Sequence, residues 1–314
     1  MNLDFSDIKV LVVGDFMIDH YIIGESNRMS PEAPVPVVVP KEEYSIPGGA
    51  GNVAMNISTM GSQVSCLGAI GNDIFGEKLI KIFNENNVSS EHIEIIDNYS
   101  TTLKQRIYCN GIQVARVDKE ELLNWNPNQT ESSLDYSDYD VIILSDYDKG
   151  ALIRPWFFKP KKTNVILDPK NKRHEHLFMH SNIITPNLNE LKKLSGMNIN
   201  NNDSIINACN KLIEENNFEY IIAKKGDKGM TIVGEQNFIK HIESHRVDNP
   251  DVTGAGDTVI AALSIAYAKT NDIEYSAKFA NAAAAIAVSK AGTASVTIDE
   301  INNYIEMSNE KSNK

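Results

Sequence analysis

The chain has 314 residues, of which 42% are hydrophobic and 23% charged, and its formal net charge is −12 at pH 7. This balance is typical of a globular protein, and the negative charge excludes a general binder of nucleic acids or anionic membranes, which would need a basic surface. The N-terminus lacks a signal-peptide pattern, no apolar run has membrane-spanning length, and the scattered Cys66, Cys109 and Cys209 are typical of a reducing compartment, so we expect a soluble cytoplasmic protein.

Continuous apolar runs recur along the chain and predict buried strands. The first is Ile8–Val13, which ends at Gly14. Such runs lack the polar alternation of a half-exposed strand, so they are typical of central strands covered on both faces. Further runs of this kind occupy residues 64–70, 141–145, 165–167, 183–184 and 220–223.

Helical segments separate several of these runs. An alternation of strands and helices predicts a doubly wound, mostly parallel α/β sheet with helices on both faces. We expect one domain of this kind over residues 1–314. The predicted helices span residues 51–60, 75–86, 187–195 and 204–216.

Two stretches break the alternation and predict a small β-flap, or lid, over one end of the sheet. Residues 34–45 and 101–118 have strand character with no helix between them and their neighbours, and Asn110-Gly111 is a strong hairpin signal. The lid segments are expected at about 16–45 and 101–118. The apolar V-P-V-V-V at 35–39 predicts a lid strand that pairs with a second copy, giving a homodimer.

The first glycine-rich segment is P-G-G-A-G-N at residues 47–52, directly before a predicted helix. Gly48 and Gly49 leave backbone N–H groups free to face a ligand, and Asn52 adds a side-chain amide. A tight strand-to-helix turn explains the same residues equally well.

Two carboxylates follow the first strand, in G-D-F-M-I-D. Open parallel sheets bind ligands beyond the carboxyl ends of their strands, so Asp15 and Asp19 are placed to accept hydrogen bonds from sugar hydroxyls. Asp15 could instead cap the next turn.

The segment D-V-T-G-A-G-D at residues 251–257 precedes a long apolar helix. The N–H groups of Ala255, Gly256 and Asp257 would converge at the helix N-terminus and form an anion site. A carboxylate there repels a resting phosphate, which favours a role for Asp257 as a general base toward an attacking hydroxyl. An ordinary N-cap is the alternative.

Two later turns are suited to a nucleotide. In T-P-N-L-N-E (185–190), Asn187 and Glu190 offer oxygen ligands toward metal-bound phosphate, and Mg²⁺ often uses such groups through water. In K-K-G-D-K-G (224–229), glycines allow a close backbone turn with Lys224 nearby. Each turn could also be ordinary loop structure.

In this order the four segments resemble the ribokinase-like family, the phosphofructokinase-B carbohydrate kinases. The resemblance implies an enzyme that binds ATP and Mg²⁺, with K⁺ as an additional cation in many members. The implied roles are Asp257 as base; Gly254, Ala255 and Gly256 as anion hole; Asp15, Asp19, Gly48, Gly49 and Asn52 as sugar ligands; Asn187, Glu190, Lys224, Gly226, Gly229 and Asn281 at the nucleotide, with Glu190 toward Mg²⁺; and Asp251 and Thr253 at the monovalent cation.

A narrower resemblance is to the kinases of bacterial heptose activation. It rests on G-D-F-M-I-D-H-Y (14–21), N-R-M-S-P-E-A-P-V-P-V-V (27–38), L-S-D-Y-D-K-G-A-L (144–152) and L-D-P-K (167–170). The resemblance implies phosphorylation of D-glycero-β-D-manno-heptose 7-phosphate at O1 in ADP-heptose and lipopolysaccharide biosynthesis. Bidentate arginine is suited to phosphate, so we expect the clamp for the distal phosphate among Lys104, Arg106, Arg116 and Lys170, although solvated lid charges would look the same.

Other functions on this fold remain open. The chain could be another kinase of the family, acting on ribose, fructose, a sugar phosphate or a nucleoside, or a catalytically silent nucleotide-binding protein. Many heptose kinases are fused to a C-terminal nucleotidyltransferase domain with an H-x-G-H motif. That motif does not occur in residues 1–314, so no such domain is expected within them.

Overall fold

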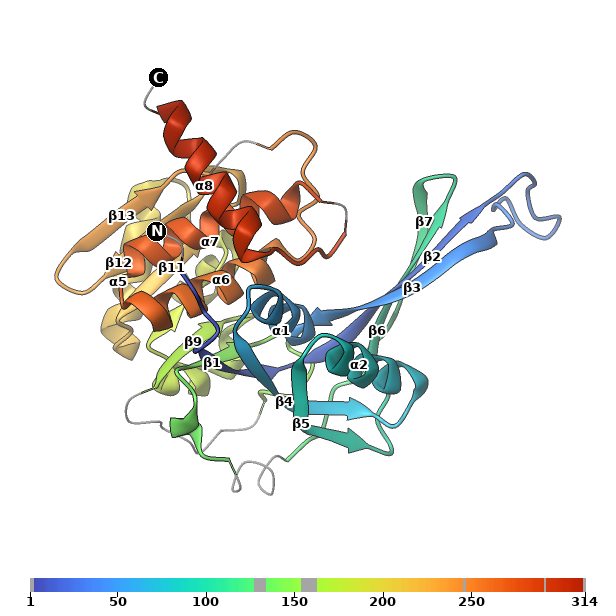
Figure 1. Cartoon of the computed structure of the whole chain (residues 1–314), viewed down its shortest axis with the longest axis horizontal. Helices are drawn as coiled ribbons and strands as arrows, with labels where there is room; N and C mark the ends of the chain where they lie inside the picture. The colour runs from blue at the N-terminus through green and yellow to red at the C-terminus, as the bar shows by residue number, and fades with distance from the viewer. Residues whose placement is uncertain (1–2, 127–133, 154–162, 245–246, 291, 313–314) are drawn as a thin grey trace.

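The structure is a computed structural model that describes residues 3–126, 134–153, 163–244, 247–290 and 292–312. Figure 1 shows a body of strands and helices from which a long, twisted β-sheet projects to one side. The body holds the apolar runs predicted from the sequence, and the projecting sheet is the lid.

The central sheet of the body is mostly parallel. In the described residues nine strands form it, in the order β13-β12-β11-β10-β9-β8-β1-β4-β5, and only β12 and β13 run antiparallel to their neighbours. The strands are β1 (Lys9–Gly14), β4 (Gln63–Gly71), β5 (Val88–Ile96), β8 (Val141–Ser145), β9 (Asn164–Asp168), β10 (Ile183–Ile184), β11 (Tyr220–Lys224), β12 (Met230–Gly234) and β13 (Phe238–Ile242).

The sheet is apolar on both faces because alternate side chains enter two different cores. Along β1, Val10 and Val12 belong to one buried cluster, whereas Leu11 and Val13 belong to the other. Successive side chains of a strand point to opposite faces, so an unbroken apolar run needs a cover on each side. The predicted doubly wound α/β fold is confirmed.

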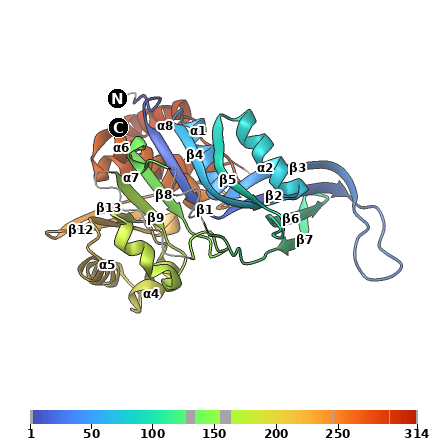
Figure 2. The ribbon, with the colours of Figure 1, turned by 90° about the horizontal axis from the view of Figure 1, so that it is seen from below.

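Helices supply both covers, and Figure 2 shows them on the two sides of the sheet. The first core includes side chains of α1, α2, α6, α7 and α8, and the second those of α4 and α5. Of these helices, α6 and α7 are the most apolar and bury most of their length. The bounds are α1 (Ala50–Thr59), α2 (Ile74–Glu85), α4 (Leu188–Ser195), α5 (Asn202–Asn216), α6 (Ala255–Thr270), α7 (Ile273–Val288) and α8 (Ile298–Ser312), with short 3-10 helices η1 (Tyr136–Asp138), η2 (Lys172–His180) and η3 (Gly226–Lys228).

The lid is a separate four-stranded sheet in the order β3-β2-β6-β7. Its strand β2 begins just after β1 ends, and β3 runs directly into α1, so the lid is continuous with the body at two points. The hairpin predicted at Asn110-Gly111 is confirmed, since both residues have positive φ between β6 and β7. The lid strands are β2 (Phe16–Glu25), β3 (Val39–Gly49), β6 (Thr102–Cys109) and β7 (Ile112–Lys119).

The structure differs from the sequence interpretation at the edges of the body. Strands β5, β12 and β13 were not predicted. The edge strands β5 and β13 have a mixed polar pattern rather than an apolar run, whereas β12 is a short buried strand between β11 and β13. Residues 306–312, whose polar sequence favours fraying, continue α8. None of the helices in the described part of the chain has the length and apolar character needed to span a bilayer.

Candidate active site

The first turn of α6 forms the centre of the site. Gly254 caps the helix with φ 74°, and a Cβ there would lie 2.5 Å from Thr293 Cγ2 and 2.6 Å from Asn52 Nδ2, so only glycine fits. The first N–H groups of a helix have no intrahelical partner, which leaves those of Gly256 and Asp257 for an anion. The Ala255 N–H, also predicted for this anion hole, donates to the Val252 carbonyl at 3.3 Å.

The Asp257 carboxylate lies beside this helix start and is held at both oxygens. It is 4% exposed. The Asn52 amide donates to Oδ2 at 2.8 Å, and the Tyr147 hydroxyl donates to Oδ1. Burial raises the pKa of Asp257 to about 6, although the bonds from Tyr147 and Asn52 oppose the rise. A carboxylate with a pKa this close to neutral is suited to removing a proton from a hydroxyl.

Asp15 lies between β1 and β2 and fastens the loop that follows β8. Its Oδ2 accepts the N–H groups of Tyr147 at 2.8 Å and Lys149 at 3.1 Å, and its Oδ1 accepts that of Ala151 at 2.9 Å. Asp15 is buried, and we predicted it as a sugar ligand. In the structure its carboxylate holds the loop that carries Tyr147, and its role as a sugar ligand stays a prediction.

The end of β3 brings the first glycine-rich segment against the lid. A side chain at Gly48 would meet the Asp19 carboxylate at 2.6 Å, so glycine allows the lid to approach the start of α1. Gly49 is the residue before α1, and Asn52 is in its first turn. The segment therefore joins the lid to Asp257 through the Asn52 amide.

Three predicted lid cations lie on the same face of the lid as Asp19. Strand register pairs Asp19 with Lys104 and Arg106 with Arg116, which places these side chains on one face. Arg106 Nη1 donates to Asp19 Oδ1 at 2.6 Å, and Arg116 makes two bonds to Asp118, at 2.7 and 2.6 Å. The lid therefore presents a mixed face, on which Lys104 and the two arginines lie among the carboxylates of Asp19 and Asp118.

Two lysines reach Tyr147 from opposite parts of the chain. The ammonium nitrogens of Lys104 on β6 and Lys170 after β9 lie 5.6 and 5.8 Å from the Tyr147 ring centroid. Burial lowers the pKa of Lys104. Lys170 also lies 3.9 Å from Glu190. Both lysines thus lie beside Tyr147, whose hydroxyl donates to Asp257.

The predicted nucleotide side is built from the ends of β9 to β11. Asn187 and Glu190 form a capping box at the start of α4, and burial followed by the charge of Asp168 raises the pKa of Glu190. Lys224 donates to Asp168 at 2.6 Å, and its Nζ would lie 3.6 Å from a Cβ at Gly256. The lysine therefore adds a cation at the anion hole.

The remaining predicted residues lie in the turns around this side. Gly226 is the first residue of η3 after β11 and Gly229 is its C-cap, and the Asn281 side chain on α7 donates to the Glu243 carbonyl at 2.8 Å. Asp251 accepts the N–H groups of Thr253 at 3.0 Å and of residue 292 at 2.7 Å. Asp251 thereby ties two turns together beside the start of α6.

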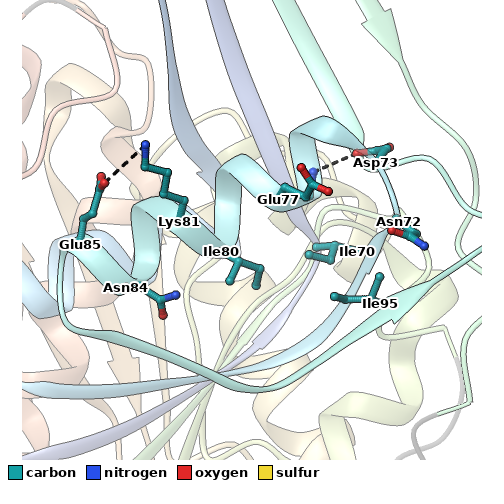
Figure 3. Close-up of a pocket in the computed structure, with 11 residues that line it drawn as sticks. Ile70, Asn72, Asp73, Glu77, Ile80, Lys81, Asn84, Glu85 and Ile95 are labelled. Atoms are coloured by element: carbon teal, nitrogen blue, oxygen red, sulfur yellow. Dashed lines mark hydrogen bonds and ion pairs between the residues drawn. The ribbon is translucent and has the colours of Figure 1, made fainter.

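A separate cavity of about 520 Å³ lies between α2 and β5. Figure 3 shows Ile70, Ile80 and Ile95 on its apolar side, with Asp73 and Glu77 at the start of the helix. Its lining shares no residue with the surroundings of Asp257. It has no part in the chemistry described here.

Sequence reasoning missed Tyr147 and Asp168 as members of the site. Asp168 is the last residue of β9, and Tyr147 lies two residues beyond the end of β8, at the edge of the sheet where Asp15 also lies. That position is the signal that could have found them, since ligands bind beyond the carboxyl ends of such strands. Within the described residues, no cluster of three or more His, Cys, Asp or Glu side chains could hold a metal ion by itself.

A buried carboxylate next to a helix N-terminus and a lysine, with further cations on the lid, is the arrangement expected of a phosphotransferase that acts on an alcohol. The sequence profile described as pfkB family carbohydrate kinase matches residues 7–300. The chain belongs to this family of carbohydrate kinases.

Relatives and solved structures agree with this assignment. The chain is 37% identical over 304 residues to the Bifunctional protein HldE of a Nitratiruptor species, a match that covers 94% of this chain and 64% of that protein. The fold matches Arabidopsis thaliana ribokinase complexed with ribose and ATP (TM-score 0.75, 19% identity, 95% and 98% of the two chains). It also matches a putative ribokinase II from E. coli in complex with ATP and Mg²⁺ (TM-score 0.69, 19% identity, 96% and 99%). The chain spans less than two thirds of the HldE relative's length.

Proposed function

We propose that the protein is an ATP-dependent kinase that phosphorylates O1 of D-glycero-β-D-manno-heptose 7-phosphate, giving the 1,7-bisphosphate in ADP-heptose biosynthesis. The observation that carries the proposal is the 37% identity over nearly the whole chain to the Bifunctional protein HldE, together with the resemblance of residues 14–21, 27–38, 144–152 and 167–170 to the kinases of heptose activation. The cations on the lid face support a substrate that already bears a phosphate.

The proposed reaction uses the groups around the start of α6. Asp257 takes the proton of the sugar hydroxyl as its oxygen attacks the terminal phosphorus of ATP; the new O–P bond forms while the bond to ADP breaks. The N–H groups of Gly256 and Asp257 together with the Lys224 ammonium stabilise the charge on the phosphoryl group during transfer. The base and the two N–H groups then lie in the first turn of α6, and the Lys224 ammonium reaches them from the end of β11.

The nucleotide is assigned to the side formed by Asn187, Glu190 and Lys224. Mg²⁺ prefers oxygen ligands and keeps several waters, so it needs no cage of protein side chains, and Glu190 with Asp168 supplies carboxylates of the required kind. When bound, Mg²⁺ neutralises phosphate charge. K⁺ is assigned to the turns at Asp251 and Thr253, following the family resemblance.

The sugar is assigned to the space between the lid and the start of α1. Asp19, Gly48, Gly49 and Asn52 border it, and Asp15 supports it through the loop after β8. Lys104, Arg106, Arg116 and Lys170 are the proposed ligands of the distal phosphate, because guanidinium and ammonium groups form charge-assisted hydrogen bonds with phosphate oxygens. We place the reaction in the cytoplasm, where ATP is available.

The test of this proposal is turnover with a panel of substrates. We expect heptose 7-phosphate to give the highest kcat/KM in an ADP-release assay, above unphosphorylated heptose, ribose, fructose and fructose 6-phosphate. A product with phosphate at O1, identified by ³¹P NMR, completes the assignment. A higher kcat/KM with another sugar would reassign the substrate, and ATP binding without turnover on any sugar would favour a silent nucleotide-binding protein.

We also propose a homodimer formed through the lid. Strand β3 is an edge of the lid sheet and carries the exposed Val39 and Tyr44, and the preceding Val35 is exposed as well. An exposed edge with apolar side chains is suited to pairing with a second copy. Light scattering at micromolar concentration should give twice the monomer mass, and Val39→Lys should reduce it toward the monomer. A monomeric wild-type protein would contradict the dimer.

A further inference from the structure

The loop after β8 delivers one hydroxyl group to the base. This loop reads S-D-Y-D-K-G-A over residues 145–151, and its Tyr147 donates the phenol O–H to Asp257 Oδ1. The Asn52 amide donates to the other oxygen, Oδ2. One neutral donor therefore holds each oxygen of the carboxylate, and the two donors come from distant parts of the sequence.

Several hydrogen bonds and ion pairs hold the backbone of this loop in place. Asp15 accepts three of its backbone N–H groups. Asp146 Oδ2 lies 2.9 Å from Nδ1 of the buried His174, and Lys149 is paired with Glu120 at 2.6 Å. These contacts fix the backbone on both sides of Tyr147, so the phenol has a defined position.

Contacts with the ring limit its movement further. The ammonium groups of Lys104 and Lys170 lie 5.6 and 5.8 Å from the ring centroid, and cations at such distances are attracted to an aromatic ring. Lys104 belongs to the lid and Lys170 to the body. The phenol therefore stands where the lid, the body and the base meet.

We propose that Tyr147 is a positioning residue for the base, which holds the Asp257 carboxylate in its orientation and leaves one lone pair of each oxygen for the sugar hydroxyl. The inference rests on the proposed role of Asp257. A carboxylate oxygen accepts two hydrogen bonds, so the bond from Tyr147 does not exclude the substrate. With a donor at each oxygen, rotation of the carboxylate is restrained before the sugar arrives.

The phenol acts as a donor and not as a second base. Desolvation and then the charge of Asp257 raise the pKa of Tyr147 well above its ordinary value, so the hydroxyl keeps its proton. Its bond favours the ionised form of Asp257 and opposes the effect of burial. Asp168 and Lys224 also face Asp257 and act in opposite directions on its pKa. Both residues remain in a Tyr147 variant, so a change in the pKa of Asp257 in that variant reports on Tyr147.

The experiment compares pH profiles of Tyr147→Phe and the wild type. The wild-type kcat/KM should fall below about pH 6, because the base works only when it is ionised. Loss of the donor raises the pKa of Asp257, so the acid limb should move to higher pH and kcat at the optimum should fall roughly tenfold. The matched control is Tyr267→Phe on α6, the helix that carries Asp257. This variant removes a phenol hydrogen bond to the Glu219 carboxylate at 3.0 Å, and we expect the position of the acid limb and kcat at the optimum to stay unchanged.

A second substitution keeps the ring and the hydroxyl. With 3-fluorotyrosine at position 147, the phenol is a stronger donor, so the acid limb should move to lower pH, opposite to Tyr147→Phe. An acid limb that stays in place in both variants would overturn the inference. If Asp257→Asn is inactive in that case, the proposed function stands although Tyr147 does not position the base. An active Asp257→Asn would instead contradict the proposed role of Asp257 as the base.

Discussion

Replacing Asp257 by asparagine should lower kcat by about 10²- to 10⁴-fold, the usual contribution of a general base. Asparagine has nearly the shape of aspartate and still offers an oxygen to Tyr147 or Asn52, but it cannot take the proton of the sugar hydroxyl. ATP binding, measured by calorimetry without sugar, should remain. The separation of binding from turnover identifies the carboxylate as the base.

The same substitution should not destabilise the protein at neutral pH. The pKa of Asp257 in the folded state, about 6, is above the ordinary value of 3.8, so the folded state binds the proton more tightly than the unfolded one. The stability contributed by this group is therefore lost as pH rises between those values, and a neutral side chain avoids the loss. An equal or higher Tm at pH 8 would exclude unfolding as the cause of inactivity.

The matched control is Asp272→Asn. Asp272 is exposed and caps α7 by accepting the Tyr275 N–H, and asparagine caps a helix as well as aspartate does. We expect wild-type kcat and Tm from this variant. Wild-type turnover from Asp257→Asn itself would show that another group removes the proton.

The second large effect is expected from the lid. Replacing Arg106 and Arg116 together by glutamine should raise KM for heptose 7-phosphate by roughly 10²- to 10⁴-fold, since hydrogen bonds between charged groups contribute about 1.5–3 kcal/mol each. KM for ATP should not change. Steady-state kinetics with each substrate varied in turn provide the measurement.

A control is needed because Arg106 also pairs with the buried Asp19 at 2.6 Å. In the double variant the buried Asp19 loses its arginine partner, and this loss alone could disturb the structure of the lid. Unphosphorylated heptose separates the two causes: its kcat/KM should change little if the arginines bind phosphate, and should fall in parallel if they only organise the lid. Lys41→Gln removes an exposed lid charge paired with Glu25 at 3.7 Å and should change neither KM.

Most of the body could be predicted from the sequence because its strands are continuous apolar runs. The run Ile8–Val13 corresponds to β1 within one residue at each end, since a strand covered on both faces leaves an unambiguous pattern. The edge strands β5 and β13 carry polar residues and leave no such pattern. Local sequence also identified the hairpin at Asn110-Gly111, because few residues adopt its positive φ angles.

The site was predictable only in part, and the limit is long-range pairing. Asp257, Asn52 and Lys224 were identified from glycine-rich turns that leave a local signature. The roles of Asp15 and Tyr147 depend on β1 lying next to β8, which aligns Gly14 with Ser145. Nothing within either segment indicates that neighbour, so the hydrogen bonds between Asp15 and the loop of Tyr147 could not be predicted.

Asp15 is also the single residue between the body strand β1 and the lid strand β2. Its backbone carbonyl accepts the Ala50 N–H at the start of α1, while its side chain grips the loop with Tyr147. One residue thus connects the first strand of the lid, the start of α1 and the loop that carries Tyr147. Any displacement of the lid at Asp15 would therefore reach the hydrogen bond between Tyr147 and Asp257 through only two side chains.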